Sequence, residues 1–292
     1  QQEYQPWLRL TPGYVKDIHE QGGTCLGASR GGFDRQKIVN ALEVYGINQV
    51  YIVGGDGTHR GAWEIHEECR ARGLKVCVAV VPKTIDNDIG IIDRSFGFNT
   101  AVAEARKAIN SVVLEAQCTP NGIGIVKLMG RHAGYIATHA TLASRQVDMC
   151  LIPEVPFEMN GENGLLAHLH RVMDSQKNAV IVVAEGAGAE LVEAEMKSDA
   201  VDESGNKRLG DIGNYLTSHI TSYFKKHKVK VSVKYVDPAY MIRSVPADAE
   251  DAVFCLFLAS HAVHGAMAGY SGFSVGMVTG RTVYIPIDVI VK

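Results

Sequence analysis

The segment Gly54-Gly55-Asp56-Gly57-Thr58 decides the fold, because it directly follows an apolar run at residues 48–53 that is typical of a buried strand. A second such run, residues 76–81, leads into PKTIDND at residues 82–88. Glycines let a backbone come close to a bound anion, since no Cβ blocks the approach. The aspartates of the two segments would repel one another and a phosphate unless a cation lay among them. The pair therefore predicts Mg²⁺-assisted phosphoryl transfer.

Around this pair, apolar runs alternate with helical patterns, which indicates a mostly parallel sheet covered on both faces. Further strands are predicted at residues 122–129, 149–152, 179–184 and 229–235, with a closing hairpin at 272–278 and 283–286. Helices are predicted at residues 37–45, 61–72, 100–117, 133–144, 164–174, 211–226 and 250–268. A surface loop is predicted at residues 186–209, where Ala, Glu, Asp, Ser and Gly dominate. The fold class is therefore α/β.

Composition excludes several classes of function. The 292 residues are 46% apolar and 21% charged, with a net charge of -3, so neither nucleic acid nor a membrane is expected as a partner. The six cysteines form no CxxC pair, which disfavours a zinc site and favours a reducing compartment. We expect a cytoplasmic protein. An organelle stays open, because the chain begins at Gln1 and a targeting segment could have been removed.

The candidate site residues all follow predicted strands, and ligands of such folds bind beyond the carboxyl ends of the strands. They are Asp56, residues 84–88, the Met129-Gly130-Arg131 turn, Glu154, Glu185 and residues 240–243. A plainer interpretation of GGDGT is a tight turn with a solvated aspartate, and the motif also occurs in proteins similar to NAD kinase and diacylglycerol kinase. Convergence of all these residues at strand ends favours a phosphate site.

In order and spacing, seven motifs resemble 6-phosphofructokinase, most closely the plant-type and protist-type ATP-dependent branch: GGDGT, PKTIDNDI, GFNTA, KLMGRHAG, IPEVPF, VVAEGAG and DPAYMIRS. The similarity runs from about residue 12 to residue 286. It implies two doubly wound, Rossmann-like lobes with the active site in the cleft between them. The larger, nucleotide-binding lobe would comprise residues 1–98 and 244–292, and the smaller, sugar-phosphate-binding lobe residues 99–243.

The resemblance also implies roles for individual residues. Asp86 matches the general base that takes the proton from the 1-hydroxyl of fructose 6-phosphate, with Arg131 and Thr84 beside it in catalysis. Asp56 matches the residue linked to Mg²⁺, and Asp88 would lie close to the same metal ion. The ATP-binding residues implied are Arg30, Gly31, Gly55, Asp56, Gly57 and Thr58. The implied sugar-phosphate residues are Thr84, Ile85, Asp86, Met129, Gly130, Arg131, Glu185, Tyr240, Met241, Ile242 and Arg243.

Two positions would set the phosphoryl donor. Gly57 is typical of ATP users, since an Asp there would occupy the space of the α-phosphate, whereas Lys83 is typical of pyrophosphate users. We expect Gly57 to decide for ATP. A pyrophosphate-dependent enzyme and a non-catalytic regulatory subunit remain as alternatives.

Two further expectations concern parts of the family pattern that this sequence does not contain. The family's first strand and its glycine-rich loop would lie before residue 1. Gly122 stands where bacterial relatives have an arginine that binds the 6-phosphate across a subunit interface. A homo-oligomer, either a dimer or a tetramer, is expected, with Lys234 reaching the sugar phosphate of a neighbouring subunit.

Overall fold

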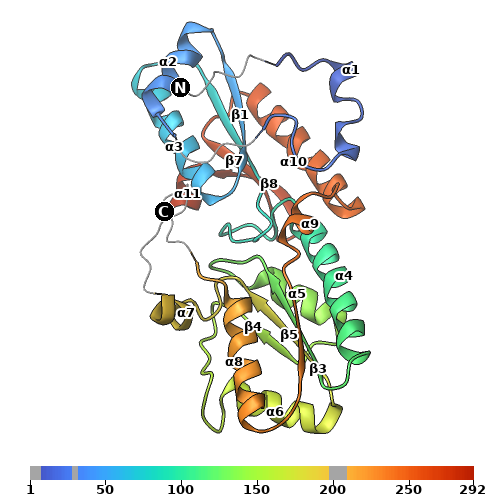
Figure 1. The fold of residues 1–292 in the computed structure, drawn as a ribbon. Coiled ribbons are helices and arrows are strands. Elements are labelled where there is room, and N and C mark those ends of the chain that lie inside the picture. The colour runs from blue at the N-terminus through green and yellow to red at the C-terminus, as the bar shows by residue number, and fades with distance from the viewer. Residues whose placement is uncertain (1–7, 28–31, 197–208) are drawn as a thin grey trace.

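The computed structural model describes residues 8–27, 32–196 and 209–292, which form two four-stranded sheets stacked end to end along the molecule (Figure 1). The first sheet has the order β1 (Gln49–Gly54), β2 (Cys77–Pro82), β7 (Phe273–Val278), β8 (Arg281–Pro286). The second has the order β4 (Met149–Leu151), β5 (Ala179–Ala184), β3 (Gly122–Leu128), β6 (Ser232–Val236). The predicted α/β fold with two doubly wound lobes is confirmed.

All strand pairs are parallel except β7 with β8, which form the predicted closing hairpin. Its turn holds Thr279 and Gly280, both with positive φ. The central strands are continuous apolar runs because both of their faces are covered. In β5, for example, Ile181 and Val183 pack into one core, and Val180 and Val182 pack into the core on the opposite face.

Helices supply the other half of each core. The first sheet is covered on one face by α2 (Arg35–Val44), α3 (Asp56–Ala71) and α11 (Ile287–Val291), and on the other by α10 (Ala249–Met267). The second is covered by α4 (Phe98–Gln117) and α5 (Tyr135–Ser144) on one face, and by α6 (Leu165–Gln176) and α8 (Ile212–Lys226) on the other. None of the described helices is long and apolar enough to cross a membrane.

Three expectations about element boundaries were wrong. The helix expected from residue 61 begins at Asp56, because Gly55 adopts the extended N-cap conformation and an acidic residue in the first turn is favoured by the helix dipole. The loop expected at residues 186–209 contains α7 (Ala189–Met196), and its remainder at 197–208 lies outside the described residues. The strand expected from residue 229 begins at Ser232. Short helices also occur at Pro12–Val15 (α1), Ile18–Glu20 and Ala239–Arg243 (α9).

The chain passes between the sheets twice, once between β2 and α4 and once between α9 and α10 (Figure 1). A buried carboxylate joins the two crossings. Asp251 accepts hydrogen bonds from the backbone N–H and the hydroxyl of Thr100 at 2.8 and 2.6 Å, and the same hydroxyl accepts from the N–H of Asp248 at 3.0 Å. The start of α4 is thereby fixed to the start of α10.

Candidate active site

The glycines of the first segment differ in what the fold requires of them. A Cβ on Gly54 would lie 2.2 Å from Oγ1 of Thr58, so packing alone demands glycine there. A Cβ on Gly57 would meet nothing within 4 Å, and Gly57 has no positive φ, so the fold of the free protein does not explain this glycine. Gly57 instead leaves open space at the N-terminal turn of α3, where backbone N–H groups and the helix dipole favour an anion.

Asp56 projects from the same turn and forms an ion pair with Arg60 at 2.7 Å, with both side chains in contact with solvent. Within the described ranges, no group of three or more His, Cys, Asp or Glu side chains could hold a metal alone. Mg²⁺ characteristically takes one or two carboxylates together with substrate phosphates, rather than a closed protein cage. An accessible Asp56 beside an open anion site fits that pattern of ligation.

The second segment is held against the first by backbone contacts. The N–H of Lys83 donates to the Gly54 carbonyl at 2.9 Å, and Lys83 pairs with Phe96 in an isolated bridge. Asn87 has a φ of 56°, and its side chain accepts from the N–H of Ser95 at 2.7 Å. The Ser95 hydroxyl in turn donates to the Thr84 carbonyl at 2.6 Å. These hydrogen bonds shape the turn that carries Asp86, so Ser95 is a site-building residue that sequence reasoning did not single out.

Asp86 has the most informative electrostatic environment among the described residues. Burial raises its pKa to about 6, and the nearby carboxylates of Asp88 and Glu185 contribute in the same direction. Arg243 and Lys83 oppose the increase. These four groups come from both halves of the chain: Lys83 and Asp88 follow the first sheet, whereas Glu185 and Arg243 follow strands of the second. Charged residues expected from separate strand ends, among them Glu185 and Arg243, therefore act on Asp86.

The ends of β3 and β5 are joined closely. The N–H of Glu185 donates to the Leu128 carbonyl at 2.8 Å, and the N–H of Gly186 donates to the Gly130 carbonyl at 3.1 Å. A Cβ on Gly186 would lie 1.9 Å from the backbone oxygen of Arg131. This contact places the Met129-Gly130-Arg131 turn beside Glu185, as expected for one ligand edge.

The predicted residues 240–243 form α9. Ile242 is 4% exposed and packs into the core beneath α4, so its side chain anchors the helix and is not open to a ligand. Tyr240, Met241 and Arg243 are exposed. The positive charge of Arg243 acts to lower the pKa of the Asp86 carboxyl, so the two side chains share one electrostatic environment.

Four further residues named from the sequence are Arg30, Gly31, Gly122 and Lys234. Arg30 and Gly31 lie outside the described residues. Gly122 is buried, and a Cβ there would lie 2.1 Å from the Ala116 carbonyl oxygen, so this backbone has no room for the arginine of bacterial relatives. Lys234 forms an ion pair with Glu115 at 3.2 Å.

His59 is a functional candidate that sequence reasoning missed. It is buried one residue after GGDGT, with Nδ1 2.8 Å from the Gly55 carbonyl oxygen and Nε2 3.0 Å from Oγ of Ser274. Burial lowers its pKa, so the ring is neutral at pH 7, with Nδ1–H donating to Gly55. The sequence does show a histidine directly after GGDGT, but its side-chain partner, Ser274, lies 215 residues away in the sequence.

Comparison with known proteins decides the family. Residues 3–266 match the family model described as Phosphofructokinase. The chain belongs to the phosphofructokinase family. This family membership confirms the resemblance carried by the motifs.

The curated relatives of this phosphofructokinase chain include plant and bacterial proteins. "ATP-dependent 6-phosphofructokinase 7" of Arabidopsis thaliana is 57% identical over 279 residues, which cover 96% of this chain and 58% of that protein. "ATP-dependent 6-phosphofructokinase" of Amycolatopsis methanolica is 46% identical, over 98% of this chain and 63% of that protein. The chain thus spans about 58% of the length of the plant relative.

Solved phosphofructokinases share the fold. The pyrophosphate-dependent phosphofructokinase of Marinobacter aquaeolei superposes with a TM-score of 0.77 at 19% identity, over 94% of this chain and 67% of that one. Phosphofructokinase of Saccharomyces cerevisiae gives a TM-score of 0.73 at 20% identity, over 97% and 38%. At these identities, the likeness supports the architecture alone.

Proposed function

We propose that the full-length protein transfers the γ-phosphoryl group of ATP to the 1-hydroxyl of fructose 6-phosphate, with Mg²⁺, giving fructose 1,6-bisphosphate and ADP. The observation that supports this proposal is the set of charged side chains from both sheets that act on Asp86. The carboxylate of Asp86, with a pKa raised to about 6, feels the charges of Arg243, Lys83 and Glu185, and its segment contacts the glycine turn, where a Cβ on Gly55 would lie 3.5 Å from Cβ of Thr84. Membership of the phosphofructokinase family supports the same reaction.

Asp86 acts as the general base. Near pH 7 it is mostly ionised, yet it is more basic than an ordinary aspartate, which suits a group that accepts the proton of an alcohol during attack. The sugar oxygen forms a bond to the γ-phosphorus, its proton passes to Asp86, and the bond to the β-phosphate oxygen breaks with its electron pair leaving on ADP. Asp56 would hold Mg²⁺, which would supply positive charge to the phosphates.

The other residues of the site have separate roles in this proposal. Arg243 and Tyr240 hold the 6-phosphate, because a guanidinium can bind a phosphate through two parallel hydrogen bonds. Arg131 and Thr84 stabilise the transferred group. Met129, Gly130 and Glu185 shape the sugar pocket at the joined ends of β3 and β5.

ATP is the proposed donor. The open space at Gly57 accommodates an α-phosphate, and relatives at 51–57% identity are named ATP-dependent. Lys83 is the one feature that favours pyrophosphate. We also propose a homo-oligomer. The apolar side chains of Val253, Leu256 and Phe257, which α10 leaves exposed, support a covered surface in the full-length protein.

The test is turnover by the full-length protein with Mg²⁺ and fructose 6-phosphate, supplied in parallel with ATP or pyrophosphate. We expect turnover with ATP and none with pyrophosphate. Asp86→Ser should lower kcat by ~10²–10⁴-fold with little change in KM for fructose 6-phosphate. A variant that retains more than half of the wild-type kcat would refute the general base, and equal rates with both donors would refute the ATP assignment.

A further inference from the structure

Lys127 places a positive charge in a strand that is otherwise apolar and buried. Its neighbours on β3, Ile125, Val126 and Leu128, are fully buried, and the Lys127 side chain is only 17% exposed. An ammonium that loses most of its hydration is costly unless anions and hydrogen-bond acceptors replace the water. The position therefore requires a specific set of partners.

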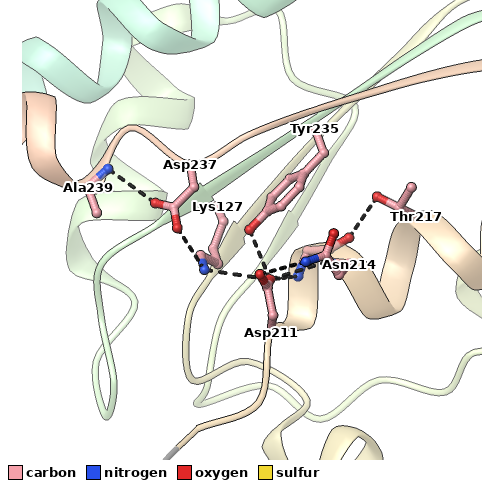
Figure 2. A network of polar contacts seen from close by, with 8 residues as sticks. Lys127, Asp211, Asn214, Thr217, Tyr235, Asp237 and Ala239 are labelled. Carbon is pink, nitrogen blue, oxygen red and sulfur yellow. Dashed lines mark hydrogen bonds and ion pairs between the residues drawn. The ribbon is translucent and has the colours of Figure 1, made fainter.

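The register of the second sheet supplies them. Val126 lies opposite Val236 at the end of the parallel β3–β6 pair, so Lys127 and Asp237 are the next residues along the two strands. The Lys127 ammonium lies 2.8 Å from Asp237 and 3.5 Å from Asp211. Figure 2 shows this ammonium between the two carboxylates, with the Tyr235 hydroxyl donating to Asp211 at 2.9 Å.

The titration behaviour agrees with a tightly paired cluster. Burial would lower the pKa of Lys127, but the hydrogen bonds to Asp237 and Tyr235 outweigh it and raise the pKa. Burial, together with Asp211, raises the pKa of Tyr235 to about 12, although Lys127 opposes the rise. Lys127 therefore keeps its positive charge at physiological pH, between the side chains of Asp211 and Asp237.

Each carboxylate also controls a helix start. Asp211 accepts from the N–H groups of Gly213 and Asn214 at 3.0 and 3.2 Å, which caps α8. Asp237 accepts from the N–H of Ala239 at 3.1 Å, at the beginning of α9. Lys127 thus joins the central strand of the second sheet to the segment that carries Tyr240 and Arg243 (Figure 2).

We propose that Lys127 is a positioning residue for the sugar-phosphate end of the site. It holds Asp237, Asp237 holds the first turn of α9, and α9 sets where the Arg243 guanidinium stands relative to Asp86. Without this link, the five-residue helix would keep only its apolar contacts with the core, through Ala239 and Ile242. The inference rests on the proposed function only in naming fructose 6-phosphate as the ligand; the mechanical link itself is independent of the ligand.

The test uses Lys127→Met, Lys127→Arg and Asp237→Asn in the full-length protein, with Lys107→Met as a matched control. Lys107 also forms a lysine ion pair, at 2.6 Å with Glu104, but on an exposed face of α4. Asp237→Asn removes the charge pairing with Lys127 but leaves Asp211 paired, so it serves if Lys127→Met fails to fold. The measurements are KM for each substrate, kcat, and hydrogen exchange of the amides at residues 239–243.

Lys127→Met and Asp237→Asn should each raise KM for fructose 6-phosphate by roughly tenfold or more, while KM for ATP changes by less than about twofold. Exchange at residues 239–243 should accelerate, Lys127→Arg should restore most of the binding, and Lys107→Met should change nothing. Equal losses for both substrates, or unchanged exchange at 239–243, would overturn the inference. If the wild-type protein does not phosphorylate fructose 6-phosphate, the proposed function fails. Hydrogen exchange at residues 239–243 then tests by itself whether Lys127 holds α9 through Asp237.

Discussion

Gly186 lies so close to Arg131 that a methyl group on its Cα would stand 1.9 Å from the Arg131 carbonyl oxygen. Gly186→Ala should therefore force the ends of β3 and β5 apart, costing about 1–3 kcal/mol of stability and weakening fructose 6-phosphate binding. Thermal unfolding and substrate titration measure both effects. Gly57→Ala is the control for stability, because a Cβ there meets nothing within 4 Å. An alanine at 186 that left both quantities unchanged would show that the backbone relaxes freely.

Replacing Asp86 should raise the stability of the protein at pH 7 although it lowers the activity. Its pKa is about 6 in the folded protein against an ordinary value of 3.8, so the folded state is favoured below pH 3.8 and loses that advantage as pH rises through 6. Asp86→Asn should therefore stabilise the protein at pH 7 by about 1–3 kcal/mol and give no such gain near pH 4. Chemical denaturation at the two pH values tests this. A variant less stable than wild type at pH 7 would contradict the assigned environment.

The pH dependence of turnover should report the same carboxylate. We expect kcat/KM to fall below about pH 6 as Asp86 becomes protonated. Asp88→Asn removes a negative charge that raises this pKa, so the acidic limb should move to lower pH. Asp174→Asn, which changes an exposed carboxylate on α6, is the control and should leave the limb in place. A limb that Asp88→Asn leaves unmoved would mean that another group controls the rate.

Arg243→Lys should weaken fructose 6-phosphate binding far more than ATP binding. Lysine retains the positive charge but cannot reproduce the planar fork of a guanidinium on a phosphate. Since the charge near Asp86 is kept, the acidic limb of the pH profile should stay where it is. Calorimetric titrations with each ligand distinguish the outcomes. An equal loss for both ligands would indicate that Arg243 supports the structure and does not bind phosphate.

Gly57→Asp should abolish ATP use without destabilising the fold. The new side chain has room in the free protein but brings a second negative charge beside Asp56, where the α-phosphate would lie. Like charges a few ångströms apart cost several kcal/mol in a partly dry site. Because Lys83 is already present, we expect measurable turnover with pyrophosphate. An unchanged KM for ATP would show that the nucleotide phosphates do not approach residue 57.

The sequence predicted the strands well where both faces of a strand are buried, as in β2, β3 and β5, since such strands are continuous apolar runs. It misplaced the start of α3, because two glycines and an aspartate resemble a loop even when they form the first turn of a helix. It also missed α7, whose Ala- and Glu-rich sequence was grouped with its polar surroundings.

The chemistry at strand ends was predictable, but the contacts that build the site were not. Ser274 lies 215 residues from His59, Asp237 reaches Lys127 through the register of the second sheet, and Asp211 reaches it from the start of α8. No local pattern encodes such pairs. A lone lysine within an apolar strand was the available signal, and it predicts that partners exist without saying which they are. The assignments to ATP and to the sugar phosphate stay predictions for the experiments above.

The carboxylate of Asp251 gives the two connections between the sheets a common fixed point. Asp251 binds Thr100, and Thr100 also binds Asp248. If the beginnings of α4 and α10 slid past one another, the buried Asp251 carboxylate would lose its hydrogen-bond donors, which is costly. Movement of one lobe against the other is then expected to be a rotation about this point, with little translation. Ile85 and Ile242 both pack into the core beneath α4, so the neighbouring residues Asp86 and Arg243 would turn together during such a rotation and keep their separation.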